Sequence, residues 1–82
     1  MDIDMGTRGQ RFVQFLKMKR RAKRGSDDDF DDAAFSVELH VEYQTLKRWL
    51  DAGSIDRIDI DNFLAVYNVY GKELMDYLAE EG

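Results

Sequence analysis

The sequence contains no cysteine and no proline, and His40 is its single histidine. Without cysteine, disulfides and thiolate metal sites are excluded, and the composition fits a reducing compartment. Without proline, no helix is interrupted by a residue that lacks a backbone N–H. The chain also lacks a glycine-rich phosphate loop, and its one histidine lies at a predicted turn, so no arrangement of residues typical of a catalytic site stands out. We therefore expect that the protein is not an enzyme and that it uses no cofactor.

Long apolar runs are also missing, and the N-terminus begins with acidic residues rather than with a basic-then-apolar leader. The sequence therefore predicts neither a membrane span nor secretion, and we expect a cytoplasmic protein. Its 82 residues predict one small domain. A domain of this size buries about 60 % of the surface that its unfolded chain exposes. Hydrophobic residues make up 44 % and charged residues 35 %, as is typical of a folded globular chain.

The formal net charge is −5, but the charges are unevenly spread along the chain. Residues 1–25 hold eight lysines and arginines against two aspartates, and the next ten residues hold five aspartates and no cation. The chain after residue 51 has seven acids and two bases. Because salt screens charges over about 8 Å, a partner responds to the nearest patch and not to the net charge. An acidic protein with a basic N-terminal third can therefore still bind a polyanion.

Apolar residues recur at helical spacing between the predicted turns. The expected helices cover residues 8–23, 31–39, 42–51, 59–70 and 72–81. Gly25 is the expected stop of the first helix, and an aspartate of the following loop is expected to cap the second. The 59–70 helix is apolar nearly all round, which predicts burial on more than one side. No segment alternates as a strand does, so we expect an all-α fold. Residues 1–7 are open to either an ordered structure or a disordered tail.

The second and third helices are joined by a tight turn at residues 40–41, which is typical of a helix-turn-helix. At this point the sequence resembles the lambda-repressor-like DNA-binding domains, also called the Cro/cI or XRE family. The resemblance lies in "AAFSVELHVEYQTLKRWLDAG" and in the downstream "IDIDNFLAVYNVYGKELMDYL", and it covers about residues 8–80. The positions with matching spacing in the first segment are Phe35, Ser36, Leu39, Val41, Thr45, Leu46, Trp49 and Gly53.

The resemblance implies a compact five-helix domain with a helix-turn-helix at about residues 31–51. It also implies a transcriptional regulator that binds double-stranded DNA at specific sequences. Family members usually bind palindromic operators as two-fold dimers. Small stand-alone members are often phage or plasmid repressors or antitoxin-like autoregulators, so the resemblance suggests a repressor or an autoregulator.

Three positions depart from the family pattern. His40 replaces the glycine of the turn, where a positive φ is often required, and histidine tolerates such a φ better than most residues. Asp32 stands where the family commonly has a glutamine that contacts phosphate, so we do not expect this position to touch the DNA backbone. Glu42 begins the third helix where the family often has a small capping residue.

The third helix has one apolar and one polar side. Leu46, Trp49 and Leu50 are expected to fix it to the domain. The residues expected to face outward toward DNA are Tyr43, Gln44, Thr45, Lys47 and Arg48. Glutamine can pair with adenine and arginine or lysine with guanine, while the threonine and the tyrosine can reach a phosphate or a thymine methyl group. The alternative is that these are ordinary solvated residues on an exposed helix face.

The basic segment "KMKRRAKR" at residues 17–24 has several readings. Arg21, Lys23 and Arg24 are expected to contact DNA phosphates independently of sequence. The alternatives are a solvated helix end paired with nearby aspartates, a nuclear import signal and an RNA-binding helix.

In the acidic segment that follows, Asp27, Asp29, Asp31 and Glu38 have the spacing of a calcium-binding loop. Aspartate stands where that loop needs glycine, so no metal site is expected.

A homodimer would need an apolar contact surface, and the last two helices offer spare apolar and aromatic residues for it. The candidates are Val66, Tyr70, Met75 and Tyr77, with the monomer core as their alternative role.

Two hypotheses for function follow from the sequence. The first is a sequence-specific DNA-binding regulator with double-stranded DNA as its partner. The second is a helix-turn-helix fold that binds a protein partner without specific DNA binding.

Overall fold

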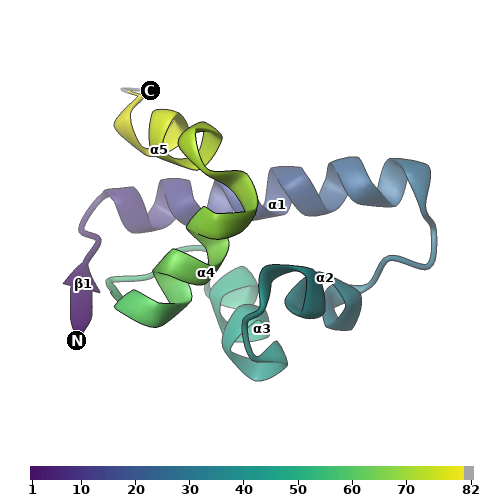
Figure 1. The fold of residues 1–82 in the computed structure, drawn as a ribbon, viewed down its shortest axis with the longest axis horizontal. Helices are drawn as coiled ribbons and strands as arrows, with labels where there is room; N and C mark the ends of the chain where they lie inside the picture. Colours follow the sequence, from purple (N-terminus) through teal and green to yellow (C-terminus); the bar gives the residue numbers. More distant parts are fainter. Residues whose placement is uncertain (81–82) are drawn as a thin grey trace.

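A computed structural model describes residues 1–80 of the chain. Within these residues, 70 % of the chain is helical, in five helices, and two short strands form a small sheet (Figure 1). In chain order the elements are β1 (Asp2–Asp4), α1 (Arg8–Ser26), α2 (Asp32–Leu39), α3 (Tyr43–Ala52), β2 (Arg57–Asp59), α4 (Ile60–Tyr70) and α5 (Lys72–Ala79). The expectation of a mainly helical domain is confirmed, and the expectation that no strand occurs is wrong.

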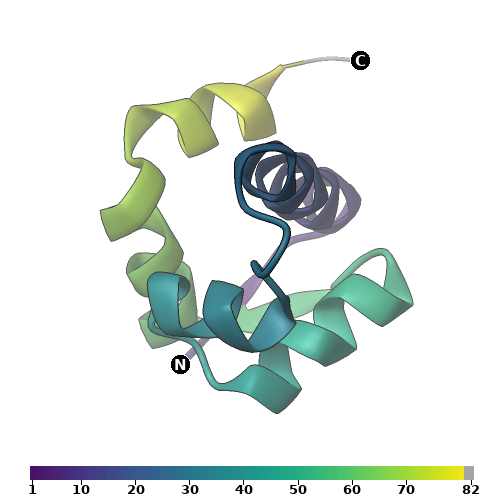
Figure 2. The ribbon, with the colours of Figure 1, turned by 90° about the vertical axis from the view of Figure 1, so that its right-hand side faces the viewer.

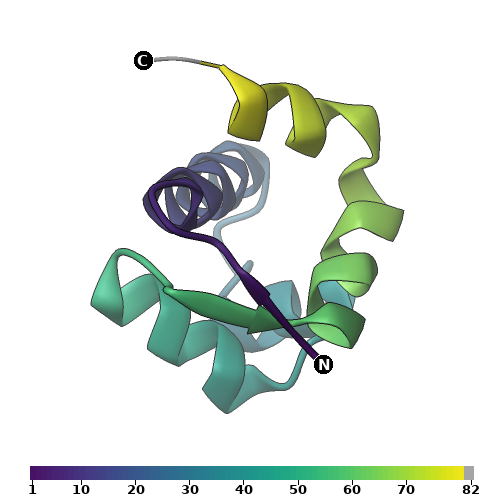
Figure 3. The same ribbon diagram turned by 90° about the vertical axis from the view of Figure 1, so that its left-hand side faces the viewer.

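The small sheet joins the N-terminus to the segment before α4 (Figure 3). Strands β1 and β2 are antiparallel, with Ile3 opposite Ile58. Beyond the strands, the Met5 N–H donates to the Asp56 carbonyl at 2.8 Å and the Ile60 N–H donates to the Met1 carbonyl at 2.9 Å. These bonds fix the first residues of the chain, so residues 1–7 are an ordered part of the domain and not a disordered tail.

Helix α1 is the central element, and the other helices pack around it. Its buried side consists mainly of Phe12, Phe15 and Leu16, which are fully buried. The helix is longer than expected, because it continues through Gly25 and ends at Ser26. The Ser26 hydroxyl and the Asp27 N–H both donate to the Lys23 carbonyl, one of the carbonyl groups that the end of a helix leaves without a helical partner. Gly25 is therefore an ordinary helical residue, and its expected role as a stop is wrong.

Helices α2 and α3 are joined by the turn at His40, as the sequence predicts. His40 has a left-handed backbone, with φ 58° and ψ 37°. The Val41 N–H donates to the Ser36 carbonyl at 3.1 Å, which closes the end of α2. At the other end of α2, the side chain of Asp31 accepts a hydrogen bond from the Ala34 N–H at 2.9 Å. The expected aspartate cap is therefore present.

Helix α4 lies at one edge of the molecule, and the views at right angles show it beside α2 and α5 (Figures 1 and 2). Its inner side packs through Val66, which is fully buried. Leu64 and Tyr67 are 47 % and 39 % exposed on its outer side. The expectation that this helix is buried on more than one side is therefore wrong. Besides β2, α2 and α5, it meets α1, because the rings of Phe63 and Tyr70 pack on Phe12 and Phe15, while its outer apolar residues meet solvent.

Candidate nucleic-acid interface

Helix α3 is held firmly on its inner side. Leu46 is fully buried, and Trp49 and Leu50 are each 5 % exposed. The Trp49 ring meets the Phe12 ring of α1 edge to face, with the ring centroids 5.7 Å apart. Such aromatic pairs add about 0.5–1.5 kcal/mol to the stabilisation from buried area. At the end of α3, Gly53 has a positive φ of 79°, which stops the helix. The three apolar residues expected to anchor this helix do so.

The opposite side of α3 is open to solvent. Tyr43, Gln44, Lys47 and Arg48 are all exposed, while Thr45 is half-buried at the border with the inner side. Gln44, Lys47 and Arg48 also line one shallow hollow on this side. The residues predicted to face outward therefore gather on one surface, except that Thr45 is partly covered. We call this the α3 surface, formed by Tyr43, Gln44, Lys47 and Arg48.

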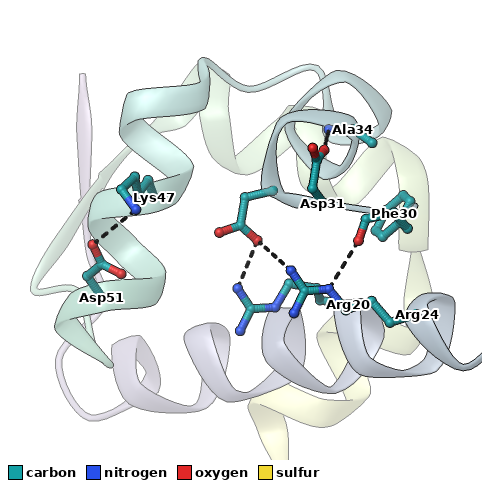
Figure 4. Close-up of polar contacts among 8 residues, drawn as sticks. Arg20, Arg24, Phe30, Asp31, Ala34, Lys47 and Asp51 are labelled. Carbon is teal, nitrogen blue, oxygen red and sulfur yellow. Dashed lines mark hydrogen bonds and ion pairs between the residues drawn. The ribbon is translucent and has the colours of Figure 1, made fainter. Parts of the chain in front are cut away.

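Asp51 is the acid that pairs with a cation of the α3 surface. The Lys47 Nζ atom is 3.9 Å from the Asp51 Oδ2 atom, one helical turn away (Figure 4). Both side chains are more than half exposed, so the pair is screened by solvent and contributes little to stability. A phosphate or a guanine edge can therefore compete with Asp51 for the lysine. No other acidic side chain of residues 1–80 forms an ion pair with a cation of this surface.

The basic part of α1 differs from the prediction, because two of its three expected phosphate contacts are engaged within the domain. The Lys23 Nζ atom is 3.3 Å from the Glu38 Oε1 atom of α2. The Arg24 Nε atom donates to the Phe30 carbonyl at 3.0 Å (Figure 4). Arg21 is exposed, and no ion pair within residues 1–80 involves it. Of the three predicted side chains, Arg21 is thus the one that faces solvent without an internal partner.

Asp32 is the acid that organises this end of α1. Its Oδ1 atom accepts a hydrogen bond from the Arg20 Nη1 atom at 2.9 Å and lies 3.8 Å from the Arg24 Nη2 atom (Figure 4). The side chains of Arg20 and Asp32 are each 23 % exposed, so this pair is better shielded from water than the Lys47 pair. Asp32 thus faces α1, where it pairs with the two arginines. Pairing of the basic helix end with nearby aspartates was one alternative from the sequence, but this particular pair could not be named, because its two residues belong to different elements.

The acidic loop between α1 and α2 uses its carboxylates for local hydrogen bonds. The Asp27 side chain accepts from the Asp29 N–H at 3.0 Å, and Asp31 caps α2. Within residues 1–80, no group of three histidine, aspartate or glutamate side chains is arranged to hold a metal ion.

The four candidate dimer residues have different environments. Val66 is fully buried in the core, so its side chain is not available to a partner, and its assignment to an interface is wrong. The rings of Tyr70 and Tyr77 pack on Phe15 of α1, with centroid distances of 5.1 and 5.3 Å, and both residues are half-buried. Met75 is 42 % exposed. Met75 is thus the candidate with the most accessible side chain, and it lies on the same helix pair as the exposed Leu64 and Tyr67.

No protein-family model matches the chain, and no curated protein or solved structure is significantly similar to it. The resemblance to the lambda-repressor-like domains therefore rests on the sequence motifs alone. None of the helices in residues 1–80 is both long enough and apolar enough to cross a membrane.

Proposed function

We propose that this protein is a sequence-specific regulator of transcription that binds double-stranded DNA. In this proposal α2 and α3 form a helix-turn-helix of the lambda-repressor-like kind, and α3 enters the major groove. One observation carries the proposal. The inner side of α3 is fixed by Leu46 and Trp49, while the α3 surface presents an amide and two cations to solvent. The combination of a rigid anchor and an open polar side is what a groove-reading helix requires.

The dimensions of α3 suit this role. Its ten residues span about 15 Å, and the major groove is about 12 Å wide. A helix of this length can insert its first two turns while its last turn stays outside the groove. The residues that project from the first two turns include Gln44, Lys47 and Arg48, whereas Asp51 lies in the last turn. Asp51 would thus lie at the end of α3 that stays outside the groove, away from the base edges.

The side chains of the α3 surface have the chemistry of base recognition. Gln44 can donate to and accept from the N7 and N6 edge of adenine. Lys47 and Arg48 can donate to O6 and N7 of guanine, and each good pair gives about 1–3 kcal/mol of discrimination. Tyr43 and Thr45 border this set and are suited to a phosphate or a thymine methyl group. The proposal therefore predicts an operator half-site that contains both adenine and guanine.

The proposal includes a two-fold dimer that binds a palindromic operator, because one domain reads too few base pairs for tight binding. The exposed apolar side chains of Leu64, Tyr67 and Met75 are available for the contact between subunits. The resemblance to stand-alone repressors suggests that the protein represses its target genes, including its own.

Selection from a library of random duplexes tests the proposed function. We expect enrichment of one palindromic sequence whose half-sites lie about one helical turn apart. With about eight phosphate contacts per dimer, affinity for that sequence should fall about 10³–10⁵-fold between roughly 50 and 200 mM salt. If repeated rounds enrich no sequence, the regulator proposal fails. A stable complex with a protein partner would then favour the use of the fold as an interaction module.

A further inference from the structure

Helix α1 contains eight cations and no acid. Five of the cations form ion pairs with four acids of other elements within residues 1–80. These pairs are Arg11 with Glu80, Lys19 with Glu73, Arg20 and Arg24 with Asp32, and Lys23 with Glu38. The cations that form no such pair within the described residues are Arg8, Lys17 and Arg21. Four carboxylates thus compensate about half of the charge of α1 and leave the rest open.

Lys17 and Arg21 lie one helical turn apart on the side of α1 that faces away from the core. Figure 2 looks along this helix and shows α5, α4, α2 and α3 around it, with one side of the helix left uncovered. Both residues are exposed. Like charges four residues apart on a helix repel each other, at a cost of about 0.2–0.5 kcal/mol. An anion placed between the two side chains would remove that repulsion.

Two neighbouring hollows share these two side chains. One is also lined by Gln14 and Met18, and the other by Arg20 and Arg24. Asp32 holds the two arginines from the side of α2. We call the strip of Gln14, Lys17, Arg20, Arg21 and Arg24 the α1 surface, in which Arg20 is half-buried and the other four residues are exposed. It carries four cations and contacts one carboxylate.

The α1 surface fits a chain of phosphates. Planar guanidinium groups form paired hydrogen bonds with phosphate oxygens, and the ammonium of Lys17 adds a mobile point charge. The cations from Lys17 to Arg24 rise about 10 Å along the helix, which is longer than a single anion and suits several successive phosphates. The strip contains no aromatic side chain on which a base could stack. Recognition here would therefore depend on charge and not on sequence.

We propose that the α1 surface binds the phosphate backbone of double-stranded DNA without regard to sequence, as a second contact separate from the α3 surface. The choice of DNA as the polyanion rests on the proposed function. The presence and position of the surface rest on the geometry of α1 alone. In this assignment Lys17 and Arg21 provide the main contacts, and Asp32 positions Arg20 and Arg24 at the border of the strip.

The test compares two double variants that remove equal charge. Lys17→Ala with Arg21→Ala removes the centre of the α1 surface. Arg57→Ala with Lys72→Ala is the control, because it removes an exposed arginine of β2 and an exposed lysine of α5. The probe is a duplex of about 20 base pairs without a selected site, and its affinity is measured by fluorescence anisotropy over a series of salt concentrations. Thermal unfolding of each variant checks that the fold is intact.

We expect the first variant to bind the probe about 10–100-fold more weakly than the parent protein at about 0.1 M salt, because two phosphate contacts are lost. The slope of log affinity against log salt should become shallower by about 2. The control variant should lose less than about threefold, because screening limits the effect of distant charges. Unchanged binding by the first variant would overturn the proposal, and so would an equal loss in both variants.

The result can be separated from the outcome for the α3 surface. Loss of the α1 surface should weaken a selected duplex and a scrambled duplex by the same factor, which leaves their ratio unchanged. If no duplex sequence is ever preferred, the proposed function fails. The affinity for the unselected probe would still be expected to depend on Lys17 and Arg21.

Discussion

Gly9 of α1 lies directly against the backbone of Ile55, the residue that leads from α3 into the small sheet. A Cβ atom on Gly9 would overlap the Ile55 carbonyl oxygen and would lie 2.7 Å from its carbonyl carbon. Only glycine permits this approach of two backbones. The contact fixes the segment behind α3 onto α1, and together with the Phe12–Trp49 ring pair it sets the position of α3.

Gly9→Ala should therefore destabilise the protein strongly, by about 3 kcal/mol or more, because backbone atoms must move to admit the methyl group. Gly25 provides a matched control in the same helix, since a Cβ there meets nothing within 4 Å. Gly25→Ala should stabilise by about 0.5–1 kcal/mol through the better helix propensity of alanine. Urea unfolding measures both changes, and equal effects of the two substitutions would contradict the close approach at Gly9.

The left-handed backbone of His40 makes a second prediction. An L-residue in this conformation costs about 1–2 kcal/mol, and glycine avoids that cost. His40→Gly should therefore keep or raise the melting temperature, although the greater freedom of glycine in the unfolded chain reduces the gain. His40→Val should lower it, because a β-branched residue is strongly disfavoured at positive φ. If His40→Gly is as destabilising as His40→Val, the imidazole has a structural role of its own.

Stability at high pH should depend on Tyr70. Burial, and next the charges of Glu38 and Glu73, raise the pKa of its hydroxyl from 10 to about 12. Between these values the unfolded chain loses the proton while the folded protein keeps it, so stability falls as the pH rises. Below pH 10 both states are protonated and this dependence disappears. The expected loss between pH 10 and 12 can be followed by urea unfolding at a series of pH values.

Tyr70→Phe is the control for this effect, because it keeps the ring that packs on Phe15 and removes the ionising group. Its stability should change less between pH 10 and 12 than that of the parent protein. An unchanged slope in this variant would mean that other groups cause the alkaline loss.

Much of the helical framework could be predicted from the sequence. The expected bounds of α2 to α4 agree with the structure to within a residue, because apolar periodicity and caps such as Asp31 are local signals. The last helix was expected over residues 72–81. In the structure it ends at Ala79, and residue 81 lies outside the described part. The β1–β2 pair could not be predicted in this way. Its strands have three residues each and lie more than fifty residues apart, so neither shows a periodic pattern.

The candidate site was predicted only in part, because helical periodicity is a local signal. Helical periodicity alone places Gln44, Lys47 and Arg48 opposite Leu46 and Trp49, and the structure has them exposed. It gives no information about partners from other elements. For that reason the ion pair of Lys23 with Glu38 and the hydrogen bond of Arg24 to the Phe30 carbonyl were not foreseen, and pairing with aspartates was only one alternative for this segment.

The burial of Val66 and the exposure of Leu64 depend on which neighbours α4 acquires. An all-round apolar helix does not specify those neighbours, because each of its sides is equally suited to the core.

The most direct test of the account is to measure how Lys47→Ala and Arg48→Ala change the ratio of affinities for a selected and a scrambled duplex. Lys72→Ala and Arg57→Ala are matched controls, since they remove the same residue types from exposed positions outside α3. We expect each α3 substitution to reduce the ratio about 5–150-fold, which corresponds to about 1–3 kcal/mol, while the melting temperature stays unchanged. The controls should leave the ratio as it is. If the ratio of affinities is unchanged by both α3 substitutions, the claim that α3 recognises the DNA sequence is contradicted.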